Sequence, residues 1–280
     1  MLSLDELKLT YLNLQNTWPV NWPGLPKVYQ QCVNQLGWDH SLISAEPELN
    51  PLYKCSIYIS SFIEKNGKID FDKNQEPAYH SRLHIADTIV GLTTLLLAQR
   101  SCNKLDLQKQ LHLELTAMLA MLGHDLLHDG SVNTYPEELE RRSIRFLRPI
   151  LSEHNVFKSD IKIIEQIILM TDPMNVPKHH EHVRQSIFDI KNVDCLGLLL
   201  QEADILASSI NGIAEVRTML LAKEWSHRYP SRSSNLVTPE GRLNFLTSYA
   251  QFSSPASQIL GIPLVIREEI RFLKDKIFNF

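Results

Sequence analysis

Three short segments of this 280-residue chain place histidine and carboxylate side chains in patterns that could hold metal ions. His80 and His84 are four residues apart, as are His124 and His128, and Asp125 directly follows His124. Residues four apart lie on one face of a helix, so each histidine pair is predicted to face one site. A buried imidazole or carboxylate is costly unless it is paired or ligated, which favours a metal site over ordinary core residues.

A fourth ligand is available in Asp204, which follows the strongly apolar run from Leu196 to Leu200. A single aspartate in such a place is more often a residue on a helix surface. Together with His84, His124 and Asp125, however, it completes two imidazoles and two carboxylates, a set suited to Zn, Mn or Fe. Asp125 has two oxygens, so it could also bridge to a second, harder ion such as Mg or Mn.

The elements that must position these residues are predicted to be helices. Glycine is sparse, at 10 residues, and most of the 14 prolines lie between periodic segments. Segments with apolar residues at three-to-four spacing are 4–14, 28–36, 83–97, 111–122, 144–151, 161–170, 193–206 and 262–273. Alternating, strand-like runs are scarce, so the sequence predicts an all-α, multi-helix bundle.

The rest of the chain is predicted to be loops and one helical extension. We expect loops at 152–159 and 229–239, and an exposed loop at the histidine-rich stretch 178–182. No convincing linker divides the chain. We therefore expect residues 1–65 to form a helical extension packed on a catalytic domain formed by residues 66–280.

Composition limits the partners and the compartment. The formal net charge of -4 argues against nucleic acid as a partner. The apolar runs are too short to cross a bilayer, and the acidic N-terminus does not resemble a signal peptide. The four cysteines form no CxxC pair, so we expect reduced thiols and a cytoplasmic protein without membrane contact. The oligomeric state stays open, a homodimer included.

The motifs and their order resemble the HD superfamily of metal-dependent phosphohydrolases and, more narrowly, the class I 3′,5′-cyclic nucleotide phosphodiesterases. The family's first motif, Tyr-His-Asn-x-x-His-Ala, resembles 79–84, with Ser81 in place of Asn. Its second, His-Asp-x-x-His-Pro-Gly-x-x-Asn, resembles 124–133, with Asp129 in place of Pro. A Thr-Asp pair and an Ala-Asp pair after apolar helices complete the set, and 171–172 and 203–204 match them in family order.

This resemblance implies an all-α fold with two divalent metal ions in a pocket. His84, His124, Asp125 and Asp204 would bind the first ion, and Asp125 would bridge to the second. Three further residues match positions that hold waters on the second ion: His128, Thr171 and a glutamate that follows the second motif. Glu138 and Glu140 are both candidates for that glutamate, and we favour Glu140.

The resemblance also implies an activity, the opening of a 3′,5′-cyclic nucleotide to its 5′-monophosphate by a hydroxide that bridges the two metals. His80 matches the general acid that protonates the leaving oxygen, a task suited to an imidazole. Gln258 is the candidate for the glutamine that binds the purine. The sequence departs from the family at Ala207, where the family has an asparagine, and at Gly261, where it has a phenylalanine that clamps the base.

Two other functions stay open. The chain could be a different HD-type nucleotide phosphohydrolase, or a nucleotide-sensing protein that has lost catalysis. The presence of every metal ligand and of the general acid favours an enzyme, a hydrolase of small phosphate esters.

Overall fold

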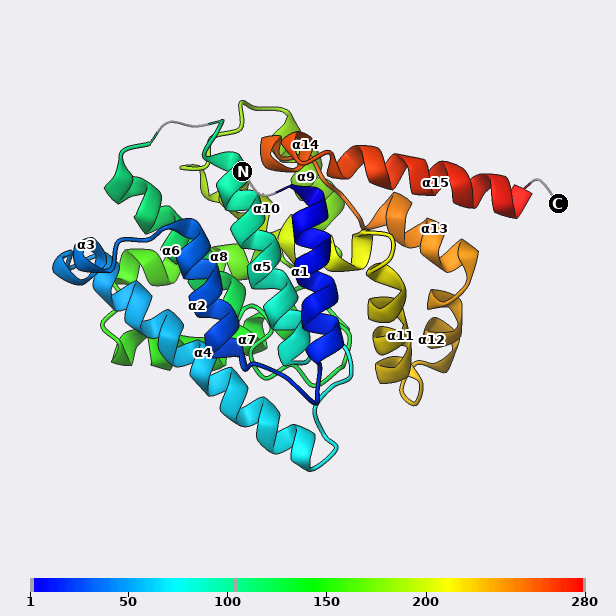
Figure 1. Ribbon diagram of the computed structural model, residues 1–280, viewed down its shortest axis with the longest axis horizontal. Helices are drawn as coiled ribbons and strands as arrows, with labels where there is room; N and C mark the ends of the chain where they lie inside the picture. Colours follow the sequence, from blue (N-terminus) through cyan, green and yellow to red (C-terminus); the bar gives the residue numbers. More distant parts are fainter. Residues whose placement is uncertain (1–2, 103–104, 279–280) are drawn as a thin grey trace.

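The computed structural model describes residues 3–102 and 105–278, which form fifteen helices and no strand (Figure 1). The helices are α1 (Leu4–Thr17), α2 (Leu25–Leu36), α3 (His40–Ala45), α4 (Leu49–Asp72), α5 (Arg82–Gln99), α6 (Leu107–Gly123), α7 (Glu138–Glu153), α8 (Lys158–Met170), α9 (Val176–Arg184), α10 (Val193–Ser209), α11 (Ala214–Trp225), α12 (Pro230–Leu236), α13 (Pro239–Ser248), α14 (Pro255–Ile259) and α15 (Ile262–Phe278). The prediction of an all-α bundle is confirmed.

Helix α5 lies at the centre of the bundle. Every residue of α5 except Leu97 is buried, because its sequence is apolar on all sides and carries no exposed polar face. It packs against α10, α2, α1, α6 and α14. Gly91 permits the closest part of this packing: a Cβ there would lie 3.2 Å from the carbonyl oxygen of Ala203 on α10. Helices α5 and α10, which carry the candidate ligands His84 and Asp204, therefore approach each other closely.

Helix α6 ends earlier than the histidine spacing predicted. Its last residue is Gly123, and His124 to Leu127 form a turn in which Leu127 adopts a left-handed backbone conformation, with φ of 59°. The prediction that His124 and His128 share one helix face is wrong, because this turn redirects the chain between them. His80 likewise precedes α5, which begins at Arg82, so His80 and His84 do not share a helix.

The N-terminal segment is part of the main core. Helices α1 and α2 pack on α5 (Figure 1), and residues from α1 to α15 belong to one hydrophobic cluster. The boundary expected after residue 65 falls inside α4. Arg82 at the start of α5 forms ion pairs with Glu64 of α4, at 2.5 Å, and with Glu76, at 2.9 Å.

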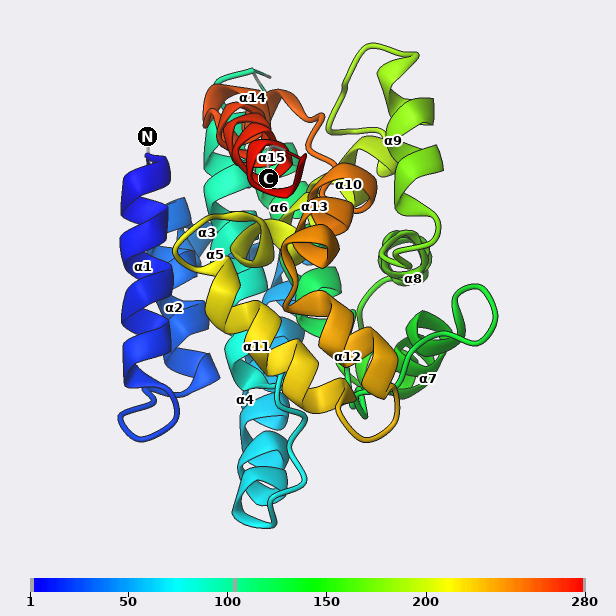
Figure 2. The ribbon, with the colours of Figure 1, turned by 90° about the vertical axis from the view of Figure 1, so that its right-hand side faces the viewer.

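The C-terminal third contains more helix than the sequence predicted. Helices α11, α12 and α13 form a group at one side of the bundle, and α15 runs beside α13 (Figure 2). The loop predicted at 229–239 is wrong, because α12 occupies most of it. The exposed loop predicted at 178–182 is also wrong: this stretch belongs to α9, and His180 is fully buried. Within 3–102 and 105–278, no helix combines the length and apolarity needed to cross a membrane.

Candidate metal centre

Four side chains predicted as metal ligands converge at one point. His84 comes from the first turn of α5, His124 and Asp125 from the turn after α6, and Asp204 from α10. The Nε2 atom of His84 lies 3.3 Å from Oδ2 of Asp125 and 3.1 Å from Oδ1 of Asp204. The Nε2 atom of His124 lies 3.3 and 3.4 Å from the same two oxygens. The fold therefore brings together residues up to 120 positions apart in the sequence.

The ligand atoms of His84, His124 and Asp204 lie within 4.8 Å of one another, so these three residues could hold one metal ion, with Asp125 in contact with both imidazoles. Ligand atoms at about 2.1 Å from an ion are about 3.0 to 3.4 Å apart when the angles between them are about 90 to 110°. The orientation of His124 supports the same interpretation. Its Nδ1 lies 2.7 Å from the Met121 carbonyl oxygen and must donate to it, which leaves the lone pair of a neutral ring on Nε2. That Nε2 is buried and has no hydrogen-bond partner among the described residues. A cation between this lone pair and the carboxylates would satisfy both.

The electrostatics of the cluster agree with this geometry. Burial lowers the pKa of His84, but the charges of Asp125 and Asp204 outweigh it and raise the pKa to about 9. Burial also lowers the pKa of His124, but Asp125 and Asp204 outweigh it and raise this pKa well above its ordinary value. Burial tends to raise the pKa of each carboxyl group, yet the imidazoles hold both well below their usual range. Both carboxylates are thus ionised at neutral pH, and a metal ion would compete with protons for the imidazoles.

Two further residues predicted to act at a second ion, Glu140 and Thr171, are buried in the structure. Glu140 is buried, and its Oε2 accepts a hydrogen bond of 2.9 Å from the Asn133 side chain. Burial and the charges of Asp172 and Asp125 raise the pKa of Glu140 to about 7. Thr171 is buried at the end of α8, where its hydroxyl donates to the Ile168 carbonyl oxygen. The charges of Glu140 and Asp125 interact, and the role of Glu140 at a second ion stays a prediction.

The sequence did not indicate one residue that contacts His80, Glu224 of α11. Its Oε1 lies 2.5 Å from Nδ1 of His80, and its Oε2 accepts the backbone N–H groups of Tyr79 and His80 at 2.7 and 3.0 Å. The glutamate therefore fixes both the ring and the backbone of His80. No local pattern indicated this, because Glu224 lies 144 residues beyond His80 in the sequence.

His80 and His128 form a stacked pair, with ring centroids 3.7 Å apart. The backbone N–H of Gly130 donates to Nδ1 of His128 at 3.0 Å. Burial and the neighbouring charge of His80 lower the pKa of His128 to about 3, so His128 stays neutral. With Glu224, the two histidines form a second group whose donor atoms lie within 4.8 Å of one another.

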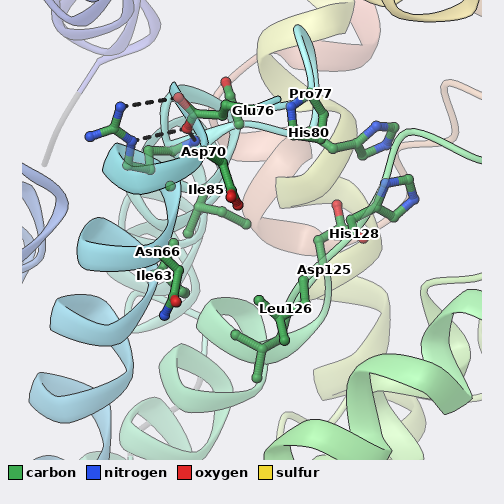
Figure 3. A pocket seen from close by; sticks show the side chains of 14 residues that line it. Ile63, Asn66, Asp70, Glu76, Pro77, His80, Ile85, Asp125, Leu126 and His128 are labelled. Carbon is green, nitrogen blue, oxygen red and sulfur yellow. Dashed lines mark hydrogen bonds and ion pairs between the residues drawn. The ribbon is translucent and has the colours of Figure 1, made fainter. Parts of the chain in front are cut away.

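A small cavity of about 60 Å³ opens beside these residues (Figure 3). His80, Asp125 and His128 line one side, and Asn66 and Asp70 of α4 line the other. A water molecule needs about 10 to 15 Å³ of such space, so the cavity of about 60 Å³ has room for about four to six waters. This volume suits water or a hydrated ion.

The remaining predicted residue, Gln258, lies on α14 with an exposed side chain. It is not among the residues that line the cavity. Its role in binding a base stays a prediction.

Comparison of the sequence with protein-family models and with curated proteins found no match.

Proposed function

We propose that this protein is a metal-dependent phosphodiester hydrolase of the HD type that opens a 3′,5′-cyclic nucleotide to its 5′-monophosphate. The observation that carries the proposal is the convergence of His84, His124, Asp125 and Asp204, with the unpartnered Nε2 of His124 directed at two carboxylates. Two imidazoles and two carboxylates suit Zn, Mn or Fe, and the free oxygen of Asp125 suits a second ion such as Mg or Mn. When bound, such ions lower the pKa of water and neutralise charge that develops on the phosphoryl oxygens.

The protein's own groups supply the proton transfer. Attack of a water oxygen on phosphorus breaks the bond to the ribose 3′-oxygen, which leaves as an alkoxide and needs a proton. His80 lies beside the metal ligands, with its ring centroid 5.7 Å from that of His84, and can donate this proton. Nδ1 of His80 donates a hydrogen bond to Glu224, which keeps the ring oriented.

The residues around the second ion position would act on water. Glu140, Thr171 and His128 carry polar atoms that can hydrogen-bond to waters on a hydrated ion next to Asp125. Residues that orient such waters tune their acidity, so these side chains affect rate more than the affinity of the first ion.

The test is hydrolysis of cyclic AMP, cyclic GMP and bis(p-nitrophenyl) phosphate by purified protein with Mn or Mg, beside Asp125→Ala. We expect turnover of a cyclic nucleotide that is lost in the variant. Turnover of the generic diester alone would keep the metal chemistry but contradict the cyclic nucleotide as substrate. A protein that binds metal and nucleotide without any turnover would be a sensor, and the proposal would be wrong.

A further inference from the structure

The loop between α6 and α7, residues 124–137, carries two of the candidate metal ligands and also His128. It forms turns and irregular backbone rather than helix or strand. Leu127 and Gly130, which lie on either side of His128 in the sequence, adopt left-handed conformations with φ of 59° and 75°. A segment of this kind depends on its side-chain contacts for a fixed shape.

Asp129, the residue after His128, joins this loop to α7. Its two carboxylate oxygens accept hydrogen bonds from the Arg142 guanidinium at 3.0 and 3.1 Å. Its Oδ1 also accepts the backbone N–H and the hydroxyl of Ser131, at 3.1 and 2.5 Å. The hydrogen bonds from Arg142 and Ser131 hold the pKa of Asp129 below its usual range, so the carboxylate is ionised at neutral pH. A bidentate arginine–carboxylate pair has one preferred geometry, and it therefore fixes the loop relative to α7.

The same part of the loop contacts α11 and the segment that follows it. Arg228 donates to the carbonyl oxygen of Asp129 at 3.5 Å, and its Nη1 lies 4.0 Å from Oδ2 of the same residue. Gly130 lies so close to α11 that a Cβ there would be 2.9 Å from Cγ of Glu224. Since Glu224 holds the ring of His80, the loop is tied both to α7 and to the helix that orients the proposed proton donor.

These contacts determine where the His128 ring lies. The ring stacks on that of His80, with centroids 3.7 Å apart. The backbone N–H of Gly130 donates to Nδ1 of His128, so the neutral ring carries its proton on Nε2, from which it can donate to water. Because Asp129 lies between His128 and Gly130 in the chain, a shift of Asp129 moves both the ring and the N–H group that orients it.

We propose that Asp129 is a positioning residue that holds His128 against His80. It does so through its ion pair with Arg142 and its contact with Arg228. Displacement of a group at a reaction centre by about 1 Å lowers the rate strongly, so a loop that carries such a group needs an anchor of this kind. This inference rests on the proposed phosphodiester hydrolysis, and it adds a residue that acts through His128 rather than on the metal or the substrate.

The experiment compares Asp129→Ala, Arg142→Ala and the double variant with wild type. It measures hydrolysis of cyclic AMP, cyclic GMP and bis(p-nitrophenyl) phosphate, metal content, and backbone hydrogen exchange in residues 126–132. Each single variant should lower kcat about ten-fold, the lower end of the effect of residues that orient a ligand. KM and metal content should stay unchanged. Hydrogen exchange in the loop should be about two- to five-fold faster, as expected for loss of a partly exposed ion pair.

The double variant should be no slower than the single ones, since all three proteins lack the same ion pair. Arg148→Ala is the matched control. Arg148 also lies on α7 and also forms a bidentate pair, but with Glu165 of α8 instead of the loop. This variant should keep the wild-type kcat and the wild-type exchange rate in residues 126–132.

A wild-type kcat in Asp129→Ala would overturn the inference, as would an equal fall of kcat in Arg148→Ala. A raised KM with unchanged kcat would also overturn it, because Asp129 would then act on substrate binding. If wild type hydrolyses none of the three compounds, the proposed function fails, and hydrogen exchange alone tests the anchor. Faster exchange in residues 126–132 of Asp129→Ala and Arg142→Ala, but not of Arg148→Ala, would support it, and equal exchange in all proteins would overturn it.

Discussion

The contact between Glu224 and His80 gives the sharpest test of the proposed proton donor. Glu224 accepts three donors: the His80 ring at 2.5 Å and the backbone N–H groups of Tyr79 and His80. A glutamine in its place has one oxygen and one NH2 group. If the oxygen faces the two backbone N–H groups, the NH2 group must face Nδ1 of His80, so the proton on that nitrogen loses its acceptor.

The expected loss follows from the type of bond. Glu224 is nearly inaccessible, with a side-chain exposure of 5%, so solvent cannot replace the contact. A hydrogen bond to a charged group contributes about 1.5 to 3 kcal/mol. Since about 1.4 kcal/mol corresponds to a factor of ten in rate, Glu224→Gln should lower kcat about 10- to 100-fold.

The assay measures kcat with saturating substrate, together with the metal content of the same preparation. Glu215→Gln is the matched control, because Glu215 lies on the same helix but is exposed and accepts a hydrogen bond from the backbone N–H of Gly212. An unchanged kcat in Glu224→Gln would refute the positioning role. If Glu224→Gln instead loses one bound ion, the positioning role is also refuted, because Glu224, His80 and His128 would then hold a metal ion themselves.

Three further predictions concern stability and its dependence on pH. Asp87 and Arg217 form a buried ion pair with contacts of 2.6 and 3.1 Å. Asp87→Asn or Arg217→Met breaks this pair, so the free energy of unfolding measured by urea titration should fall by about 3 to 5 kcal/mol. A variant as stable as wild type would contradict this prediction. Gly91→Ala places a Cβ 2.7 Å from the Tyr11 hydroxyl and should cost about 1 to 3 kcal/mol. Adding Tyr11→Phe should recover part of this loss, and no recovery would argue against the clash. Burial lowers the pKa of His180 from 6.5 to about 3. Below pH 6.5 the unfolded chain binds a proton at this histidine and the folded protein does not, so the folded state loses stability as the pH falls from 6.5 towards 3. The free energy of unfolding of His180→Gln should therefore fall less than that of wild type on acidification. Equal falls in the two proteins would contradict this explanation.

The sequence predicted the helices and the four metal-ligand candidates because both leave local signals. Apolar periodicity indicates α5, α6 and α10, and the short motifs carry His84, His124, Asp125 and Asp204. The model brings these four residues together, although the motifs themselves specify no distance between them.

Two features could not be predicted because they depend on backbone detail and long-range contact. Spacing alone placed His124 and His128 on one helix, but Leu127 turns the chain through a left-handed conformation that no sequence period reveals. Glu224 belongs to a helix with an unremarkable sequence, and only the packing of α11 brings it to His80.

The central claim is that His84, His124, Asp125 and Asp204 hold a metal ion. The most direct measurement is the metal content of wild type, His124→Ala and His154→Ala after reconstitution with Zn or Mn and removal of free ions. His154 is the matched control, because its Nδ1 contacts the Ile150 carbonyl oxygen as His124 contacts that of Met121, but it lies outside the ligand cluster. We predict that wild type and His154→Ala retain the ion and that His124→Ala loses it. Wild type without a bound ion, or equal metal content in all three proteins, would contradict the account.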